Sequence, residues 1–153
     1  MNPPEIDLGP ELIGQVLDAV DKGFERQLAF TQQMMALDST RGKEHQAQAC
    51  FFEALESRGY EMDQWSIDIA EIEDHPGFSP VKVDYDNAVN VVGTHTPVET
   101  KGRSLILNGH VDVVPTGPVD MWTRPPFEPW IEGDWLYGRG GADMKAGLCA
   151  NLA

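Results

Sequence analysis

The spacing of apolar residues changes at Gly59, and no other feature of the sequence constrains the fold as strongly. Before Gly59, apolar residues recur about every four positions, which predicts two amphipathic helices, over 10–37 and 43–58. After Gly59, short apolar or alternating runs bounded by turn-forming residues are typical of strands. These runs lie at 62–69, 88–92, 104–108 and 135–137. Two helices followed by such strands predict an α/β layer fold.

The later part of the chain adds three local expectations. The run 104–108 is almost wholly apolar, which is typical of a central strand buried on both faces. The proline-rich stretch 113–130 contains tryptophans, which favour a structured loop over disorder. Glycines at 138–141 predict a tight turn, and apolar residues spaced by four predict a helix over 144–153.

The charge and cysteine content exclude several classes of protein. The 25 acidic residues outnumber the 11 basic ones, so the net charge of −14 disfavours a nucleic-acid partner. We expect no membrane association, because no apolar run reaches about 18 residues, and the first residues lack the pattern of a signal peptide. Cys50 and Cys149 form neither a disulfide framework nor a Cys-x-x-Cys pair. We therefore expect a cytoplasmic protein.

His110 and Asp112 directly follow the predicted strand 104–108. Ligands of open α/β sheets bind at the carboxyl ends of strands, and residues two apart in an extended chain face the same side. A carboxylate that accepts the ring N–H of a histidine fixes its tautomer and leaves the other nitrogen for a metal. The alternative is a structural histidine that is hydrogen-bonded at a strand end, since patterns this short recur by chance.

Asp143 follows the glycine turn and opens the last predicted helix, where a carboxylate is favoured. It is a reasonable zinc ligand, and the alternative is a plain helix cap. Other catalytic patterns are missing from the sequence. The stretch from Gly138 to Asp143 lacks the third glycine of a dinucleotide fingerprint, and neither Gly-x-Ser-x-Gly nor His-Glu-x-x-His occurs.

Two longer motifs carry a resemblance to a known family. The stretches 107–115 (LNGHVDVVP) and 136–147 (LYGRGGADMKAG) resemble the acetylornithine deacetylase / succinyl-diaminopimelate desuccinylase family, which includes carboxypeptidase G and aminoacylases. Residues 39–42, 90–93 and 122–128 are similar to the family as well. The resemblance implies a zinc-peptidase-like catalytic domain, in which helices pack on a mainly parallel central sheet.

The resemblance also implies roles for three residues. His110 is a terminal ligand of one zinc, Asp112 is the catalytic carboxylate that orients His110, and Asp143 bridges two zinc ions. It further implies a cis peptide bond after Asp143, two Zn²⁺ ions per complete site with Co²⁺ as an alternative, and complete members that are often homodimers. The implied reaction is metal-dependent amide hydrolysis of a small N-acyl amino acid or a peptide.

The 153 residues lack several parts of the family pattern. The Glu-Glu pair that supplies the general base and a further ligand does not occur after Asp143. We therefore expect residues 1–153 to be the N-terminal part of the catalytic domain, without the lid and dimerisation domain or the C-terminal part, and to be inactive alone. The alternative is a non-catalytic pseudoenzyme module, or a subunit completed by a second chain.

Overall fold

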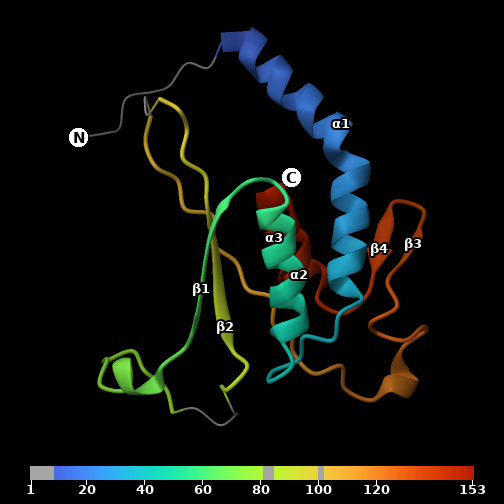
Figure 1. Cartoon of the computed structure of the whole chain (residues 1–153). Helices are drawn as coiled ribbons and strands as arrows, with labels where there is room; N and C mark the ends of the chain where they lie inside the picture. The colour runs from blue at the N-terminus through green and yellow to red at the C-terminus, as the bar shows by residue number, and fades with distance from the viewer. Residues whose placement is uncertain (1–8, 81–84, 100–101) are drawn as a thin grey trace.

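A computed structural model of the chain describes residues 9–80, 85–99 and 102–153 (Figure 1). The α-helices are α1 (Gly9–Met35), α2 (His45–Glu56) and α3 (Ala146–Leu152). The strands are β1 (Glu61–Ser66), β2 (Val89–Thr94), β3 (Trp130–Glu132) and β4 (Trp135–Tyr137). Short helical turns lie at Ile69–Glu71, Val119–Met121 and Gly141–Lys145.

The three helices lie where the sequence predicts them, with ends that differ by a few residues. Gly59 ends the α2 region as expected, because its φ of +80° lies in the left-handed range that glycine adopts without a steric cost. The Gly59 amide donates to the carbonyl of Glu56 at 2.9 Å. This turn directs the chain from α2 into β1, and α2 packs against both β1 and β2.

The prediction of a mainly parallel central sheet is wrong for the described residues. β1 pairs antiparallel with β2, and β3 pairs antiparallel with β4, so that two separate two-stranded sheets result. In Figure 1 the β1–β2 ribbon and the β3–β4 hairpin lie on opposite sides of the helices. Within the part of the chain that the structure describes, the one parallel contact outside these strands is an isolated bridge between Thr40 and Val113.

The run 104–108 explains this difference. It forms no strand, and its apolar side chains are exposed rather than buried on both faces. Leu105 is 78% exposed, Ile106 89% and Leu107 56%. An apolar run becomes a central parallel strand only where strands lie on both sides of it, and no described strand pairs with this one.

The buried core lies where the C-terminal half of α1 meets α2 and α3. Its cluster contains Met34, Ala47, Val111, Leu148 and Cys149. Partly buried apolar side chains surround the cluster, among them Phe30 and Phe51, whose rings are stacked. Cys149 is a small residue of this core, and both cysteines are free thiols.

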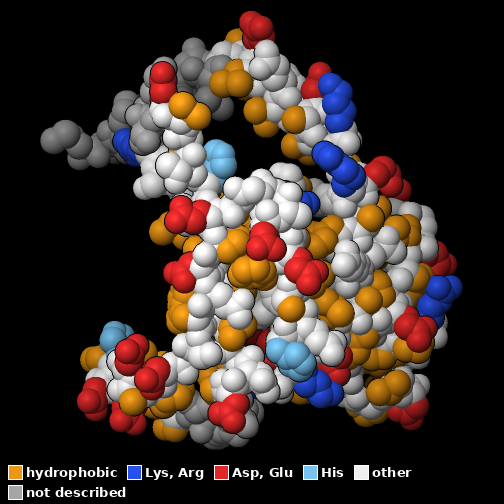
Figure 2. Space-filling view, viewed as in Figure 1, with side chains coloured by type: hydrophobic (Ala, Val, Ile, Leu, Met, Phe, Trp, Pro, Cys, Tyr) orange, Lys and Arg blue, Asp and Glu red, His pale blue; other side chains and the backbone are white. Residues whose placement is uncertain are grey.

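The N-terminal half of α1 carries the predicted apolar stripe outside this core. Its apolar side chains are between 44% and 59% exposed: Leu12, Ile13, Val16, Leu17, Val20 and Phe24. Figure 2 shows hydrophobic side chains along this projecting part of the helix. Despite its apolar stripe, neither α1 nor any other described helix combines the length and the hydropathy needed to cross a lipid bilayer.

The proline-rich stretch 113–130 is structured, as its tryptophans predict. The indole N–H of Trp122 donates to the carbonyl of Thr116 at 2.9 Å, and the guanidinium of Arg139 lies 4.9 Å from the centre of the Trp122 ring. Trp130 stacks on Tyr137 across the β3–β4 hairpin, with ring centres 4.9 Å apart. These contacts fix the route of the chain between the two motifs of the candidate site.

Candidate metal centre

His110 and Asp112 lie on an extended segment whose alternate side chains are buried. Val111 is 5% exposed and Val113 3%, whereas the side chains of His110 and Asp112 are 46% and 44% exposed. Side chains alternate between the two sides of an extended backbone, so burial of the two valines directs the histidine and the aspartate to the open side. The prediction that His110 and Asp112 share one side is confirmed.

Asp143 is presented by the glycine turn that precedes α3. Gly140 has a φ of +76°, and a Cβ atom at this position would collide with Cγ1 of Val113. Glycine is therefore required both by the backbone conformation and by the close packing of the turn on the extended segment. The peptide bond between Asp143 and Met144 is cis, as the resemblance implied.

The two motifs meet at the His110 ring. His110 Nε2 lies 3.1 Å from Oδ1 of Asp143, although the residues are 33 positions apart. His110 Nδ1 lies 3.0 Å from the carbonyl oxygen of Asp112 and 3.0 Å from its Oδ1. The Asp112 and Asp143 oxygens are all acceptors, so each of the two ring nitrogens faces an aspartate, Nδ1 facing Asp112 and Nε2 facing Asp143.

The two aspartates raise the pKa of His110. Burial alone acts to lower this pKa, but it is outweighed by the hydrogen bond to the Asp112 carbonyl, the charge of the Asp112 carboxylate and the contact with Asp143. The surroundings of the ring thus favour positive charge. The same two carboxylates would favour a metal cation beside Nε2, where it would replace the second ring proton.

The kinds of atoms and their spacing fit a zinc ion. Imidazole nitrogen and carboxylate oxygen are common zinc ligands at about 2.0–2.2 Å, and two such ligands of a tetrahedral ion lie about 3.4 Å apart. The observed separation of Nε2 and Oδ1 is 3.1 Å. Within residues 9–80, 85–99 and 102–153, no group of three or more His, Cys, Asp or Glu side chains is arranged to hold a metal. The described residues therefore offer two ligands, fewer than the roughly three protein ligands of a catalytic zinc.

Two buried residues that contact the backbone next to the site were given no role by the sequence analysis. Lys145 is fully buried, and its Nζ donates to the carbonyls of Met34 and Leu37 at 2.8 Å each. Ser39 is also fully buried, and its hydroxyl donates to the carbonyl of Val111 at 2.6 Å. One sequence signal marks Lys145: with residues 148, 149 and 152 it shares the helix face that the structure buries.

Comparison with known proteins gives consistent matches to one family. Residues 106–153 match the profile described as Peptidase family M20/M25/M40. Over 130 residues, 83% of this chain and 28% of the relative, the chain is 33% identical to a succinyl-diaminopimelate desuccinylase of Herminiimonas arsenicoxydans. It is 43% identical over 76 residues, half of this chain and 19% of the relative, to a protein of the same name from Dechloromonas aromatica. The chain thus spans less than a third of the length of these curated relatives.

Proposed function

We propose a function from the premise that residues 106–153 of this chain belong to peptidase family M20/M25/M40. The chain supplies part of the metal centre of a hydrolase that cleaves amide bonds. The observation that carries this proposal is the contact between His110 Nε2 and Asp143 Oδ1, which joins the two family motifs within 3.1 Å. His110 and Asp143 are the proposed metal ligands.

Asp112 is the proposed catalytic carboxylate that keeps His110 ready for the metal. Its carbonyl and its Oδ1 both lie 3.0 Å from Nδ1, so they would hold a hydrogen on Nδ1 and leave the lone pair of Nε2 for the metal. The Asp143 side chain is 86% exposed, so its second oxygen is open to a second ion, in agreement with a bridging role. When bound, Zn²⁺, or Co²⁺ as an alternative, polarises the substrate carbonyl and lowers the pKa of a water molecule.

The proposed substrates are small N-acyl amino acids or peptides. The relatives from H. arsenicoxydans and D. aromatica are both named as desuccinylases, a name that refers to removal of an acyl group. Hydrolysis of an acyl–nitrogen bond is the reaction class that a zinc-activated water performs on such a substrate. Within this class we favour deacylation of the acetylornithine-deacetylase type.

The remaining ligands and the general base are proposed to come from sequence outside these 153 residues. Two ligands do not make a catalytic zinc site, and the described residues offer no third. On this proposal the chain corresponds to the N-terminal part of a catalytic domain and does not hydrolyse substrates alone. Complete members are proposed to be homodimers.

The exposed run 105–107 favours a second candidate, a subunit that is completed by a second chain. The run has three consecutive exposed apolar side chains and no described partner strand. Another polypeptide can therefore add a strand here. In this case the second chain provides both the missing strands and the missing ligands. Co-purification of this chain with a separate polypeptide that bears a Glu-Glu pair supports this candidate over a single long chain.

Zinc binding to the full chain tests the metal centre directly. Isothermal titration calorimetry should give a Zn²⁺ affinity for the wild-type chain that is lost in His110→Ala and in Asp143→Ala. The matched control is His45→Ala, because His45 is an exposed histidine on α2, a different element from those of the site. Equal zinc affinity in the wild type and both site variants would refute the assignment.

Activity is tested with the missing part restored. The chain is co-expressed with the C-terminal region of a desuccinylase relative, supplied with Zn²⁺ or Co²⁺, and assayed on N-succinyl and N-acetyl amino acids. We expect hydrolysis with the wild-type chain and its loss with His110→Ala or Asp143→Ala. Full activity in either variant contradicts the proposed roles.

A further inference from the structure

We propose that residues 34–40, the segment that ends α1 and follows it, position the candidate metal centre by holding its two halves through Lys145 and Ser39. Lys145 and Ser39 are positioning residues rather than catalytic ones. The inference rests on the proposed function only for the identity of the site, because the contacts that carry it are independent of any metal.

Lys145 ties the Asp143 half of the site to the end of α1. The last carbonyls of an α-helix have no partner within the helix, and a lysine near that end satisfies them and interacts favourably with the helix dipole. Lys145 Nζ donates to the carbonyl of Met34 in the last turn of α1 and to the carbonyl of Leu37, two residues beyond the end of the helix. Its backbone N–H donates to the carbonyl of Gly140 at 3.0 Å. One residue therefore fixes both the turn that carries Asp143 and its distance from α1.

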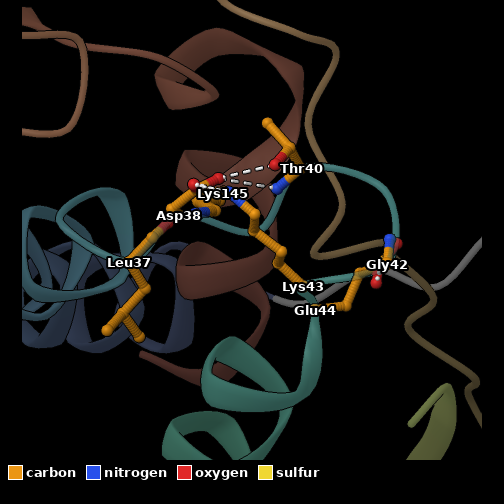
Figure 3. A network of polar contacts seen from close by, with 7 residues as sticks. All are labelled: Leu37, Asp38, Thr40, Gly42, Lys43, Glu44 and Lys145. Atoms are coloured by element: carbon orange, nitrogen blue, oxygen red, sulfur yellow. Dashed lines mark hydrogen bonds and ion pairs between the residues drawn. The ribbon is translucent and has the colours of Figure 1, made fainter.

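The burial of Lys145 makes this tie rigid. Its side chain is fully buried, and a buried ammonium is costly unless hydrogen bonds satisfy it. Any movement of the Asp143 turn away from α1 would leave the ammonium without its acceptors. Figure 3 shows Lys145 reaching the segment beside Leu37 and Asp38.

Ser39 ties the His110 half of the site to the same segment. Its hydroxyl donates to the carbonyl of Val111, and its own carbonyl accepts from the N–H of Val113 at 3.0 Å. These two hydrogen bonds hold the residues on either side of Asp112. Thr40 adds the parallel bridge to Val113. The backbone that presents His110 and Asp112 is thus attached to residues 39–40.

The segment itself is held in shape by Asp38. Its carboxylate accepts from the backbone N–H of Thr40 at 3.1 Å and from the Thr40 hydroxyl at 2.7 Å. It also pairs with Lys43 Nζ at 2.8 Å (Figure 3). Because one braced turn holds both halves, the separation of His110 Nε2 and Asp143 Oδ1 depends on residues that touch neither atom.

The test measures the site without metal, in the full chain. The probe is the ¹⁵N chemical shift of the two ring nitrogens of His110, assigned by their loss in His110→Ala. Asp143→Asn provides the reference shift for a ring whose Nε2 no longer faces the Asp143 carboxylate. The two test variants are Lys145→Met, which keeps an unbranched side chain one atom shorter and removes the ammonium, and Ser39→Ala, which removes a single oxygen atom. The matched control is Thr31→Val, because Thr31 is also buried and its hydroxyl donates to a carbonyl, that of Gln27 within α1.

We expect the His110 signals in both test variants to move at least half of the way to the Asp143→Asn values. The control should keep wild-type shifts although it also loses a buried hydrogen bond, so a merely structural effect would not reproduce the pattern. If Lys145→Met does not fold, Ser39→Ala decides the question alone. Unchanged His110 shifts in a folded Ser39→Ala variant would overturn the inference.

Measurement of Zn²⁺ binding by the wild type and the two test variants separates this inference from the proposed function. If the wild-type chain binds no Zn²⁺, the proposed metal centre fails, while the ¹⁵N shifts still decide whether residues 34–40 position the ring. If the wild type binds Zn²⁺ and both test variants bind it equally well with unmoved His110 shifts, the metal centre stands and the positioning role is wrong.

Discussion

Replacement of the buried Lys145 by Met should change the stability of the fold in a way that depends on pH. The variant loses two hydrogen bonds from a charged donor, each worth about 1.5–3 kcal/mol. It also removes a buried charge whose burial lowers the pKa of Lys145 from 10.5 to about 8, which corresponds to about 3 kcal/mol. The two effects largely offset each other at pH 7, so we expect Lys145→Met to be destabilised there by about 0–3 kcal/mol.

The pH dependence has a definite sign. The unfolded chain holds the Lys145 proton up to its ordinary pKa of 10.5, whereas the folded chain releases it near 8. The unfolded state therefore binds more protons between these values, and the wild type gains stability as the pH rises through this window. From pH 7 to pH 9.5 the gain is about 2 kcal/mol, and the methionine variant lacks it.

Urea unfolding followed by circular dichroism at pH 7, 8, 9 and 9.5 measures the difference directly. The other titrating groups, including the half-buried thiol of Cys50 and the buried thiol of Cys149, remain in both proteins and largely cancel in the comparison. The difference in unfolding free energy between wild type and variant should widen steadily with pH. A difference that stays constant from pH 7 to 9.5 would show that Lys145 does not titrate as its burial requires.

Two further variants test the geometry of the site. Asp112→Asn should lower the pKa of His110, because the charge of this carboxylate helps to raise it, and NMR titration of the ring measures the change; an unaltered or higher pKa contradicts the contact. Gly140→Ala should cost about 2–4 kcal/mol in thermal or urea unfolding, from its left-handed backbone and the collision with Val113. Gly117→Ala is the control, since its φ is +70° but nothing lies within 4 Å, and it should cost only about 1–2 kcal/mol.

The helices were predictable because the spacing of their apolar residues is a local signal. The contact between His110 and Asp143 was predictable because the two motifs that contain them are long and specific. The four-residue spacing of apolar residues can be read from the residues of each helix alone, and α1, α2 and α3 form where this spacing occurs. The meeting of His110 and Asp143 followed from two long motifs whose order and spacing resemble one family. Neither the His-x-Asp pattern nor a lone aspartate after a glycine turn would have indicated it.

The features that the sequence did not predict depend on contacts with distant parts of the chain, which a local pattern of residues does not contain. The run 105–107 has the composition of a buried strand, but burial needs neighbouring strands, and the described chain provides none for it. The stripe on the N-terminal half of α1 is likewise amphipathic without a described surface to cover it. The contacts of Lys145 join residues more than 100 positions apart, a separation at which periodicity carries no information.

The attachment of both halves of the site to residues 34–40 has a consequence for insertions and deletions. The stretch 114–137 runs between two points that are each fastened separately, so its length can vary among related proteins without moving His110 or Asp143. A single residue added between Met34 and Ser39 would instead shift one half relative to the other. Natural length variation should therefore be frequent in the proline-rich stretch and rare in the short turn after α1.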